Sequence, residues 1–446
     1  MPIMAGGASK VRQATGGRVR PQRAVRAGIR RLTRGRAAGA VLMALAHACG
    51  GAPQRGDDAA GAGNVLTGID VLVRDGAGVL ANQRVGLITN QTGRTRDGRS
   101  TIDALAGLPD VRLVALFSPE HGIRGAAQAG VRIESGRDSV TGLPIHSLYG
   151  DTRKPTPDML DGLDVLVFDI QDIGARYYTY VWTMALSMQA AAENGLSFVV
   201  LDRPNPIGGT RVDGNVLDRA FSSFVGLYAV PMRHGMTAGE LARWIVTTRQ
   251  LGVALTVIPM SGWRRDMRFE ETGLAWLAPS PNMPGIESAR HYPGTCLFEG
   301  TNLSVGRGTA EPFRQIGAPW LDGETLASRL TARGLPGVRI EPVTFTPATP
   351  GDAKHDGVLV RGIRLTVTDV ALYDPAATAV AALVEIFAMH ADQLTFRAAA
   401  FDRLAGTDQL RLSVLRGESA PAIAGSWTTG RDQFLLERAR VLLYED

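Results

Sequence analysis

The side chains best suited to acid–base chemistry are Glu120 and His121, which follow an apolar run at 111–117. Pro119 cannot continue a central strand, so both side chains should lie in the loop just beyond the strand's end. An acid beside an imidazole at such a strand end is placed where open α/β sheets bind their ligands. A polar turn with a capping carboxylate is the alternative interpretation of these residues alone.

Three further apolar runs, at 84–89, 164–170 and 197–201, also give way to polar residues and a Gly or Pro turn. Plausible helices lie between the runs, at 100–108 and 182–194. Strand–helix alternation at these intervals predicts an α/β fold with a parallel sheet. All four polar clusters should then meet in one crevice at the carboxyl edge of the sheet. The candidate crevice residues in these three clusters are Asn90, Asp169, Gln171, Asp172, Arg176, Arg203 and Asn205.

The second half of the chain predicts a smaller α/β domain. The run at 251–260 reads as one more strand of the first domain, and a passage rich in Gly, Pro and Asn follows at 279–320. Long loops inside a compact protein are usually functional or disordered, and the aromatic residues of this passage argue against disorder. A half-exposed strand is expected at 358–368 and an amphipathic helix at 376–390. We therefore expect domains at 65–290 and 291–446.

Residues 1–50 have the features of an export leader. A basic region precedes a short apolar run at 37–46, and small residues lead to Cys49. The apolar run is too short to span a bilayer. We expect an exported protein, periplasmic or extracellular, with the Gly-rich residues 51–64 as a flexible tether. Cys49 after Ala48 also leaves lipoprotein processing open.

Charge and cysteine content narrow the function classes. The formal net charge of the 446 residues is +5, but residues 1–50 hold ten Lys and Arg and no acid, so the remainder carries −5. A mildly acidic protein lacks the basic surface that nucleic-acid binding needs. Beyond the leader no apolar segment reaches membrane length, so we expect no transmembrane helix. Cys296 alone cannot form an internal disulfide.

The sequence lacks the motifs of several common catalytic and cofactor-binding sites. The turn after Thr89 has no dinucleotide-binding glycine fingerprint, and no P-loop or GxSxG elbow occurs. The seven histidines show no metal-ligand spacing, so we expect neither metal nor cofactor. Carboxylate acid–base chemistry remains, as in glycoside hydrolysis. Its candidate groups are Glu120, Asp169, Asp172, Asp202 and Glu299.

Long sequence blocks then resemble a known family. LITNQTG at 87–93, LFSPEHGIRG at 116–125, LDVLVFDIQDIGARYYTY at 163–180 and VLDRPNPIGG at 200–209 appear in that order, and YPGTCLFEGTNLSVGRGT at 292–309 continues it. This pattern is similar to the exo-β-N-acetylmuramidase family of peptidoglycan hydrolases, the NamZ type. The resemblance covers roughly residues 64–446.

The resemblance implies a Rossmann-like catalytic domain, a smaller C-terminal domain and a cleft between them. It also implies release of N-acetylmuramic acid from the non-reducing ends of peptidoglycan fragments. Glu120 is then the implied catalytic carboxylate, with His121 beside it and Tyr178 assisting, because the common family form has Phe where this chain has Tyr177. The second catalytic group and the stereochemical outcome stay open. A muropeptide-binding protein without turnover is the alternative function.

The expected substrate adds further binding candidates. The lactyl carboxylate of muramic acid calls for an arginine, whose planar fork binds two oxygens at once. Arg124, Arg176, Arg203 and Arg307 all lie in the matching blocks, and an ion pair with a neighbouring acid is the alternative role for each. The passage at 279–320 should close one end of the cleft. The polar residues expected there are His234, Asn282, Glu299, Asn302 and Arg307.

Overall fold

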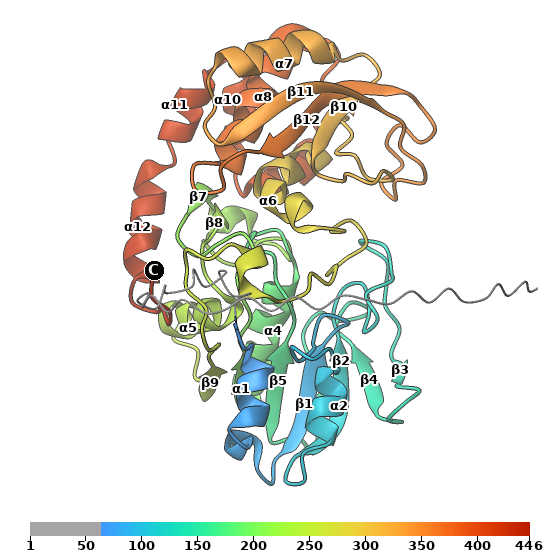
Figure 1. The fold of residues 1–446 in the computed structure, drawn as a ribbon, viewed down its shortest axis with the longest axis vertical. Coiled ribbons are helices and arrows are strands. Elements are labelled where there is room, and N and C mark those ends of the chain that lie inside the picture. Colours follow the sequence, from blue (N-terminus) through green and yellow to red (C-terminus); the bar gives the residue numbers. More distant parts are fainter. Residues whose placement is uncertain (1–63) are drawn as a thin grey trace, which may run out of the picture. The chain divides into compact units, whose positions relative to one another are not determined.

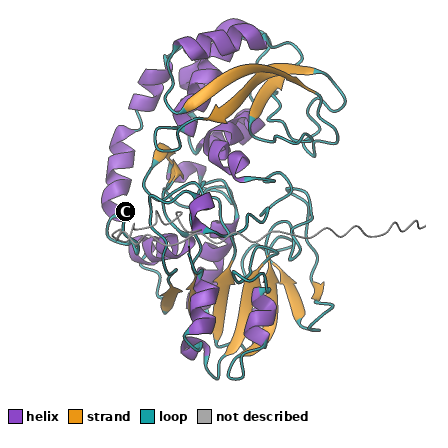
Figure 2. Cartoon of the chain, in the orientation of Figure 1, coloured by secondary structure: helices purple, strands orange, loops and turns teal. Residues whose placement is uncertain are grey.

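The computed structural model describes residues 64–446. The expected leader at 1–50 with its Cys49, and all but the last residue of the expected tether at 51–64, lie outside the described residues. Within the described part, helices and strands alternate along the first 200 residues, as the sequence predicts (Figures 1 and 2).

A seven-stranded sheet forms the centre of the first half, with strand order β3-β4-β2-β1-β5-β6-β9. Every pairing in it is parallel except that of β3 with β4. The predicted α/β class with a parallel sheet is therefore confirmed. The strands are β1 (Arg84–Thr89), β2 (Arg112–Ser118), β3 (Gly136–Arg137), β4 (Pro144–Ser147), β5 (Val165–Asp169), β6 (Ser197–Leu201) and β9 (Leu255–Ile258).

Both faces of this sheet are buried, which explains the uniformly apolar runs. Val85 and Leu87 belong to one hydrophobic core, whereas Leu166 and Phe168 belong to the other. Helices α1 and α2 cover the first core, and α4 and α5 cover the second (Figure 1). The helices of this half are α1 (Gly68–Arg74), α2 (Thr101–Ala106), α3 (Pro157–Leu160), α4 (Tyr180–Glu193) and α5 (Ala238–Arg249).

The second half is built on a three-stranded antiparallel sheet, with the order β10-β12-β11. Its strands are β10 (Gln315–Ala318), β11 (Val338–Phe345) and β12 (Val360–Val367). A further pair, β7 (Asp213–Val216) with β8 (Pro231–Arg233), falls between β6 and β9 in the chain and lies between the two sheets in the fold (Figure 1). The helices are α6 (Ile286–Thr295), α7 (Gly323–Ala332), α8 (Pro375–His390), α9 (Ala398–Ala405), α10 (Gln409–Leu415), α11 (Ala420–Gly425) and α12 (Thr428–Arg438).

The passage at 279–320 is more regular than its composition suggests. It contains α6, a short 3-10 helix η4 (Cys296–Gly300) and β10. Pro293 and Gly294 lie inside or at the end of α6, where the sequence predicts loop. Gly294 is required for packing, since a Cβ there would come 1.9 Å from the Pro375 carbonyl oxygen. The expected domain boundary at 290 falls inside α6 and stays a prediction.

The helix predicted at 376–390 exists as α8, and ten of its residues are buried. Ala376, Val380 and Leu383 lie on one face of the helix, because residues four and seven apart share a face. Helix α8 packs against α6, α7 and α11, and its Ala-rich sequence permits these close contacts. The less buried residues Ala377, Val384 and Ala388 recur at intervals of seven and four, so α8 has a more exposed side, although that side is apolar.

Candidate active site

One pocket of about 150 Å³ brings together the strongest chemical candidates of the sequence. Glu120 and His121 enter it from the loop after β2, and residues 177–180 enter from the segment that leads into α4. The opposite side comes from the 279–320 passage. Among the expected site residues, the pocket is lined by Glu120, His121, Tyr178, Asn282, Glu299 and Arg307.

Glu120 is held in place by two donors. The Thr179 hydroxyl donates to Oε2 at 2.6 Å, and the Gly130 N–H donates to Oε1 at 3.0 Å. The residue is only 7% exposed, so these bonds are largely shielded from bulk solvent. A carboxylate fixed in this way at a pocket wall is suited to proton transfer with a bound ligand.

His121 is fixed by its backbone and its ring. Its φ is +69°, a left-handed conformation that turns the chain sharply after the strand. The ring Nδ1 lies 2.6 Å from the Ala127 carbonyl oxygen. Because a carbonyl can only accept, Nδ1 carries the proton of this hydrogen bond, and Nε2 is the ring nitrogen left for a ligand.

Three of the four tyrosines that line the pocket come from residues 177–180, and they have different roles. The hydroxyl of Tyr177 donates to the Pro293 carbonyl at 2.7 Å, and that of Tyr180 donates to the Pro279 carbonyl at 2.5 Å. The Ser280 and Tyr180 side chains lie near the Tyr178 hydroxyl, but by distance and angle it makes no hydrogen bond to any of the described residues. Burial, with the nearby hydroxyl of Tyr180 and the charge of Glu120, raises the pKa of Tyr178 well above its usual value. Tyr178 is therefore a neutral donor that is available to a ligand.

Glu299 and Arg307 form an ion pair at the other side of the pocket. The Arg307 Nε donates to a Glu299 oxygen, and the guanidinium lies 5.2 Å from the Phe313 ring centroid. The charge of Glu299 outweighs the effect of burial and raises the pKa of Arg307 above its usual value. Nη1 and Nη2 of Arg307 are the atoms that could contact a carboxylate.

Arg176 does not reach the pocket. The side chain is fully buried, and its two Nη atoms donate to four backbone carbonyls, at Asn215, Val230, Leu404 and Ala405. These bonds tie the α9 region to the first half of the chain. This corrects the expectation that Arg176 binds a substrate carboxylate.

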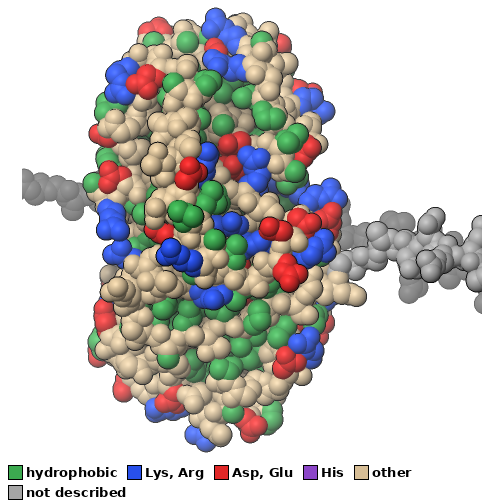
Figure 3. All heavy atoms as spheres, turned by 90° about the vertical axis from the view of Figure 1, so that its left-hand side faces the viewer, with side chains coloured by type: hydrophobic (Ala, Val, Ile, Leu, Met, Phe, Trp, Pro, Cys, Tyr) green, Lys and Arg blue, Asp and Glu red, His purple; other side chains and the backbone are tan. Residues whose placement is uncertain are grey.

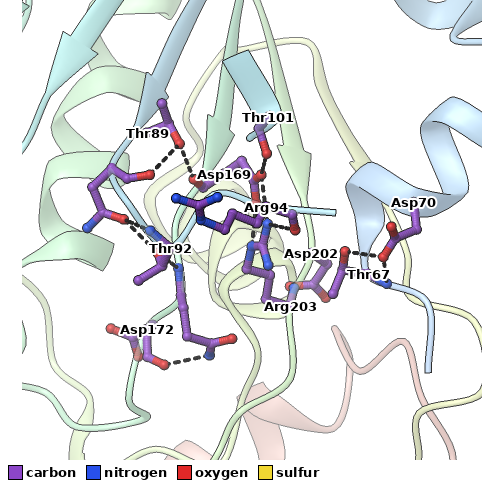
Figure 4. A network of polar contacts seen from close by, with 12 residues as sticks. Thr67, Asp70, Thr89, Thr92, Arg94, Thr101, Asp169, Asp172, Asp202 and Arg203 are labelled. Atoms are coloured by element: carbon purple, nitrogen blue, oxygen red, sulfur yellow. Dashed lines mark hydrogen bonds and ion pairs between the residues drawn. The ribbon is translucent and has the colours of Figure 1, made fainter. Parts of the chain in front are cut away.

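Asp169, Asp202 and Arg203 form a separate polar cluster under the sheet edge (Figure 4). The Arg203 Nε lies 2.5 Å from Asp169 Oδ1, and Asp169 is completely buried. Asp202 accepts hydrogen bonds from the Thr237 and Tyr444 hydroxyls, each at 2.6 Å. Each charged side chain of this cluster already has protein partners. The expectation that Asp169 contacts the substrate is therefore corrected. Arg203 lines a different pocket from that of Glu120.

Four amide side chains that the sequence places at the site form hydrogen bonds with backbone groups instead of lining the pocket. Asn302 donates to the Gln393 carbonyl at 2.9 Å and accepts from the Thr395 N–H at 3.1 Å. The amide nitrogens of Gln171 and Asn205 donate to the Pro204 and Met236 carbonyls at 2.8 and 2.9 Å. The Asn90 amide oxygen accepts from the Thr92 N–H at 2.9 Å, whereas Asn90 Nδ2 has no hydrogen-bond partner in residues 64–446. Arg124 is mostly exposed and pairs with the buried Asp138 at 2.9 Å. None of these five side chains lines the Glu120 pocket.

Asp172 and His234 form a buried pair that also lies outside the pocket lining. Asp172 Oδ2 accepts from the Gly174 N–H at 2.7 Å and lies 3.8 Å from His234 Nε2. Within residues 64–446, Asp172 Oδ1 and His234 Nε2 have no hydrogen-bond partner. Burial raises the pKa of Asp172 to about 7 and lowers the pKa of His234 to about 3.

Sequence reasoning missed the residues that position Glu120. Thr179 lies inside a matching block, and its place beside two candidate tyrosines is the only signal that could have pointed to it. Gly130 acts through its backbone N–H, which leaves no trace in a side-chain pattern. Tyr149 was also missed, although burial and the Glu120 carboxylate raise its pKa to about 12.

In the described part of the chain, no group of three or more His, Cys, Asp or Glu side chains is placed to hold a metal ion. No helix among residues 64–446 is both long and apolar enough to cross a bilayer. On the face drawn in Figure 3, basic and acidic side chains are interspersed.

Comparisons with known proteins agree with this site. The model of the exo-β-N-acetylmuramidase NamZ N-terminal domain matches residues 85–287, and that of its C-terminal domain matches 290–444. The peptidoglycan β-N-acetylmuramidase NamZ of Bacillus subtilis is 43% identical over 407 residues, which cover 91% of this chain and 98% of the relative.

Two crystal structures of DUF1343 family proteins from Bacteroides fragilis share the fold. Their TM-scores are 0.81 and 0.71, with 37% and 32% identity, and each comparison covers 86% of this chain and 99% of the other. Both family models and the Bacillus relative span most of the described residues. The chain therefore belongs to the NamZ family of exo-β-N-acetylmuramidases.

Proposed function

We propose that this protein removes N-acetylmuramic acid from the non-reducing ends of peptidoglycan fragments, with Glu120 as its acid–base carboxylate. The observation that carries the proposal is the Glu120 carboxylate, fixed by Thr179 and Gly130 at the wall of a small pocket. A glycosidase needs such a carboxyl group to exchange a proton with the glycosidic oxygen or with the attacking group.

Tyr178 supplies the second element of the proposed mechanism. Its hydroxyl is neutral, buried and without a partner in the described residues, so it can donate to an oxygen on which negative charge develops. A donor that is already oriented in a low-dielectric site stabilises such charge without reorganisation. His121, whose Nε2 is not used in the bond to Ala127, is placed to bind a sugar hydroxyl.

The size and the lining of the pocket support attack at chain ends. At about 150 Å³ it is below the roughly 300–1,000 Å³ typical of drug-sized ligands, which favours a single sugar unit over a longer glycan segment. Residues from the 279–320 passage, among them Asn282, Tyr292 and Phe313, form its opposite wall. A wall behind the terminal sugar favours exo-action over cutting within a strand.

The direct test is turnover of a disaccharide with N-acetylmuramic acid at its non-reducing end, linked to N-acetylglucosamine. We expect free N-acetylmuramic acid from the wild-type chain and none from Glu120→Gln. Binding of the disaccharide without product release by the wild-type chain would support the alternative, a non-catalytic muropeptide-binding protein.

We also propose that the protein is exported, which would place it beside the cell wall. The support is the basic and apolar pattern of residues 1–50, with Cys49 as the candidate lipid-anchor site. Cell fractionation tests export. Loss of membrane association in Cys49→Ser would identify a lipid anchor, whereas unchanged partitioning would exclude one.

A further inference from the structure

A second pocket lies at the same edge of the parallel sheet as the Glu120 pocket. It has a volume of about 280 Å³, and we call it the flanking pocket. Thr92, Gln171 and Arg203 line it from the ends of β1, β5 and β6. The chain leaves β1 towards β2 on one side and β5 towards β6 on the other, so the pocket lies at the topological switch point of the sheet. Open α/β sheets bind ligands at this point.

The ionisable side chains that line the flanking pocket are all basic. Arg94, Arg96 and Arg203 line it, and no acidic side chain does. A larger cavity, of about 1140 Å³, differs, because four acidic residues accompany its six arginines. Although Asp169 pairs with Arg203 beneath the pocket, a lining that holds guanidinium groups and no carboxylate favours an anion.

Arg94 is the arginine best placed to bind that anion. Arg203 is paired with Asp169 beneath the pocket, and Arg96 donates to backbone carbonyls. Arg94 donates from Nε to the Gln91 carbonyl at 3.2 Å and from Nη1 to the Gly98 carbonyl at 2.8 Å. Within residues 64–446 it has no carboxylate partner, and Nη2 has no acceptor. Figure 4 shows Arg94 beside Arg203, whose Nη2 donates to the Arg94 carbonyl at 2.8 Å.

The wall opposite the arginines is apolar and aromatic. Trp276 is half-buried and packs edge-on against the buried Phe269, with ring centroids 5.3 Å apart. The indole N–H donates to the Met283 carbonyl at 3.1 Å, which fixes the ring. A fixed aromatic ring offers a large apolar surface to the C–H face of a sugar. The flanking pocket thus suits a ligand that joins a saccharide ring to an anionic group.

A single short segment separates the two pockets. Leu277 lines the flanking pocket and Ser280 lines the Glu120 pocket, and three residues span at most about 11 Å. The Gln91 side chain donates to the Ala278 and Pro279 carbonyls, at 2.8 and 3.1 Å, and so anchors the segment. A glycan whose end lies in the Glu120 pocket can therefore reach the flanking pocket.

We propose that the flanking pocket binds an inner saccharide unit of the substrate through its carboxylate, with Arg94 as the recognition residue. This inference depends on the proposed function, since it places the cleaved unit in the Glu120 pocket. In a glycan of alternating muramic acid and glucosamine, the next carboxylate is the lactyl group of the inner muramic acid. Substrates longer than a disaccharide gain this contact, and the disaccharide does not.

The experiment compares the disaccharide with a tetrasaccharide, N-acetylmuramic acid and N-acetylglucosamine twice in alternation, without peptides. For Arg94→Ala we expect KM for the tetrasaccharide to rise about tenfold, the effect of one hydrogen-bonded charge contact, with KM for the disaccharide unchanged. Arg99→Ala is the matched control, because Arg99 is exposed on the same loop and lies outside the lining. It should change neither KM.

A third substrate separates the inner carboxylate from other anions. When the inner lactyl group of the tetrasaccharide is converted to an amide, the difference between wild type and Arg94→Ala should vanish. Persistence of the difference with the amide, or an equal rise in KM for the disaccharide, would overturn the proposal. Calorimetric binding of the tetrasaccharide to Glu120→Gln, with and without Arg94→Ala, gives the same comparison without turnover. Absence of disaccharide turnover in the wild type would contradict the proposed function alone, and this binding difference would still decide the role of Arg94.

Discussion

Two sets of polar residues lie at the carboxyl edge of the same sheet, and they differ in what their atoms already bind. In the cluster of Asp169, Asp202 and Arg203, each charged group is paired with protein partners. In the Glu120 pocket, the Tyr178 hydroxyl has no partner among the described residues. Buried polar groups without partners cost free energy, so a protein that keeps one beside a pocket is prepared for a ligand. Satisfied clusters instead stabilise the fold.

The largest expected effect is that of Glu120→Gln on turnover. Gln keeps the shape, accepts from the Gly130 N–H and can donate to the Thr179 hydroxyl, so the fold should persist. Turnover should fall by about 10²–10⁴, because the amide cannot exchange a proton. The measurement is the rate of release of N-acetylmuramic acid, with Glu134→Gln as an exposed control. A variant that retains more than a tenth of wild-type turnover would remove Glu120 from the acid–base role.

Arg203→Ala should instead lower the stability of the fold, in contrast to Glu120→Gln, which should lower turnover and leave the fold intact. Removing Arg203 leaves the Asp169 carboxylate completely buried without its counter-charge. We expect a loss of about 3–5 kcal/mol in the free energy of unfolding. Denaturant unfolding measures the loss. A change below 1 kcal/mol would show that the cluster is not a structural unit, and the comparison would fail.

Tyr178→Phe should lower kcat and kcat/KM together, by about 10- to 100-fold, if the hydroxyl contacts developing charge. Stability should not fall, because the hydroxyl has no hydrogen-bond partner in residues 64–446. Steady-state kinetics on the disaccharide measure both constants. A rise in KM with kcat unchanged would make Tyr178 a binding platform only.

Arg307→Ala should reduce the preference for muramic acid over N-acetylglucosamine at the non-reducing end. Arg307 is the one arginine among the four candidates that lines the Glu120 pocket. An unpaired lactyl carboxylate there would cost about 1–3 kcal/mol. The ratio of kcat/KM for the two sugars measures the preference. Arg124→Ala is the control, and equal ratios in both variants would place carboxylate recognition elsewhere.

The pH dependence of stability should change at Asp172, whose pKa is raised to about 7 by burial. Because the folded state holds this proton more tightly than the unfolded chain, Asp172 lowers stability as the pH rises from about 4 to 7. Asp172→Asn removes this term. The stability of the variant relative to wild type should therefore increase with pH, by about 1.4 kcal/mol per unit at most. Urea unfolding at pH 5 and pH 7 measures it, and a pH-independent difference would contradict the assignment.

The sequence predicts the sheet well and the site only in part. The ranges predicted for β1 and β6 match the structure residue for residue, because a strand buried on both faces is a bounded apolar run. The position of Glu120 follows from the same logic. The role of Arg176 could not be predicted in this way, because its four carbonyl partners come from segments 39 to 229 residues away. Nothing local distinguishes such an arginine from one that faces a ligand.

The central claim is that the Glu120 pocket accepts one terminal sugar and that Glu120 acts on it. The most direct measurement is a time course of products from intact glycan strands with a non-reducing terminal muramic acid. The account predicts free N-acetylmuramic acid from the first time point, no large fragments, and no product with Glu120→Gln. Early large fragments without free N-acetylmuramic acid would mean an open groove and an endo-acting enzyme, and would contradict it.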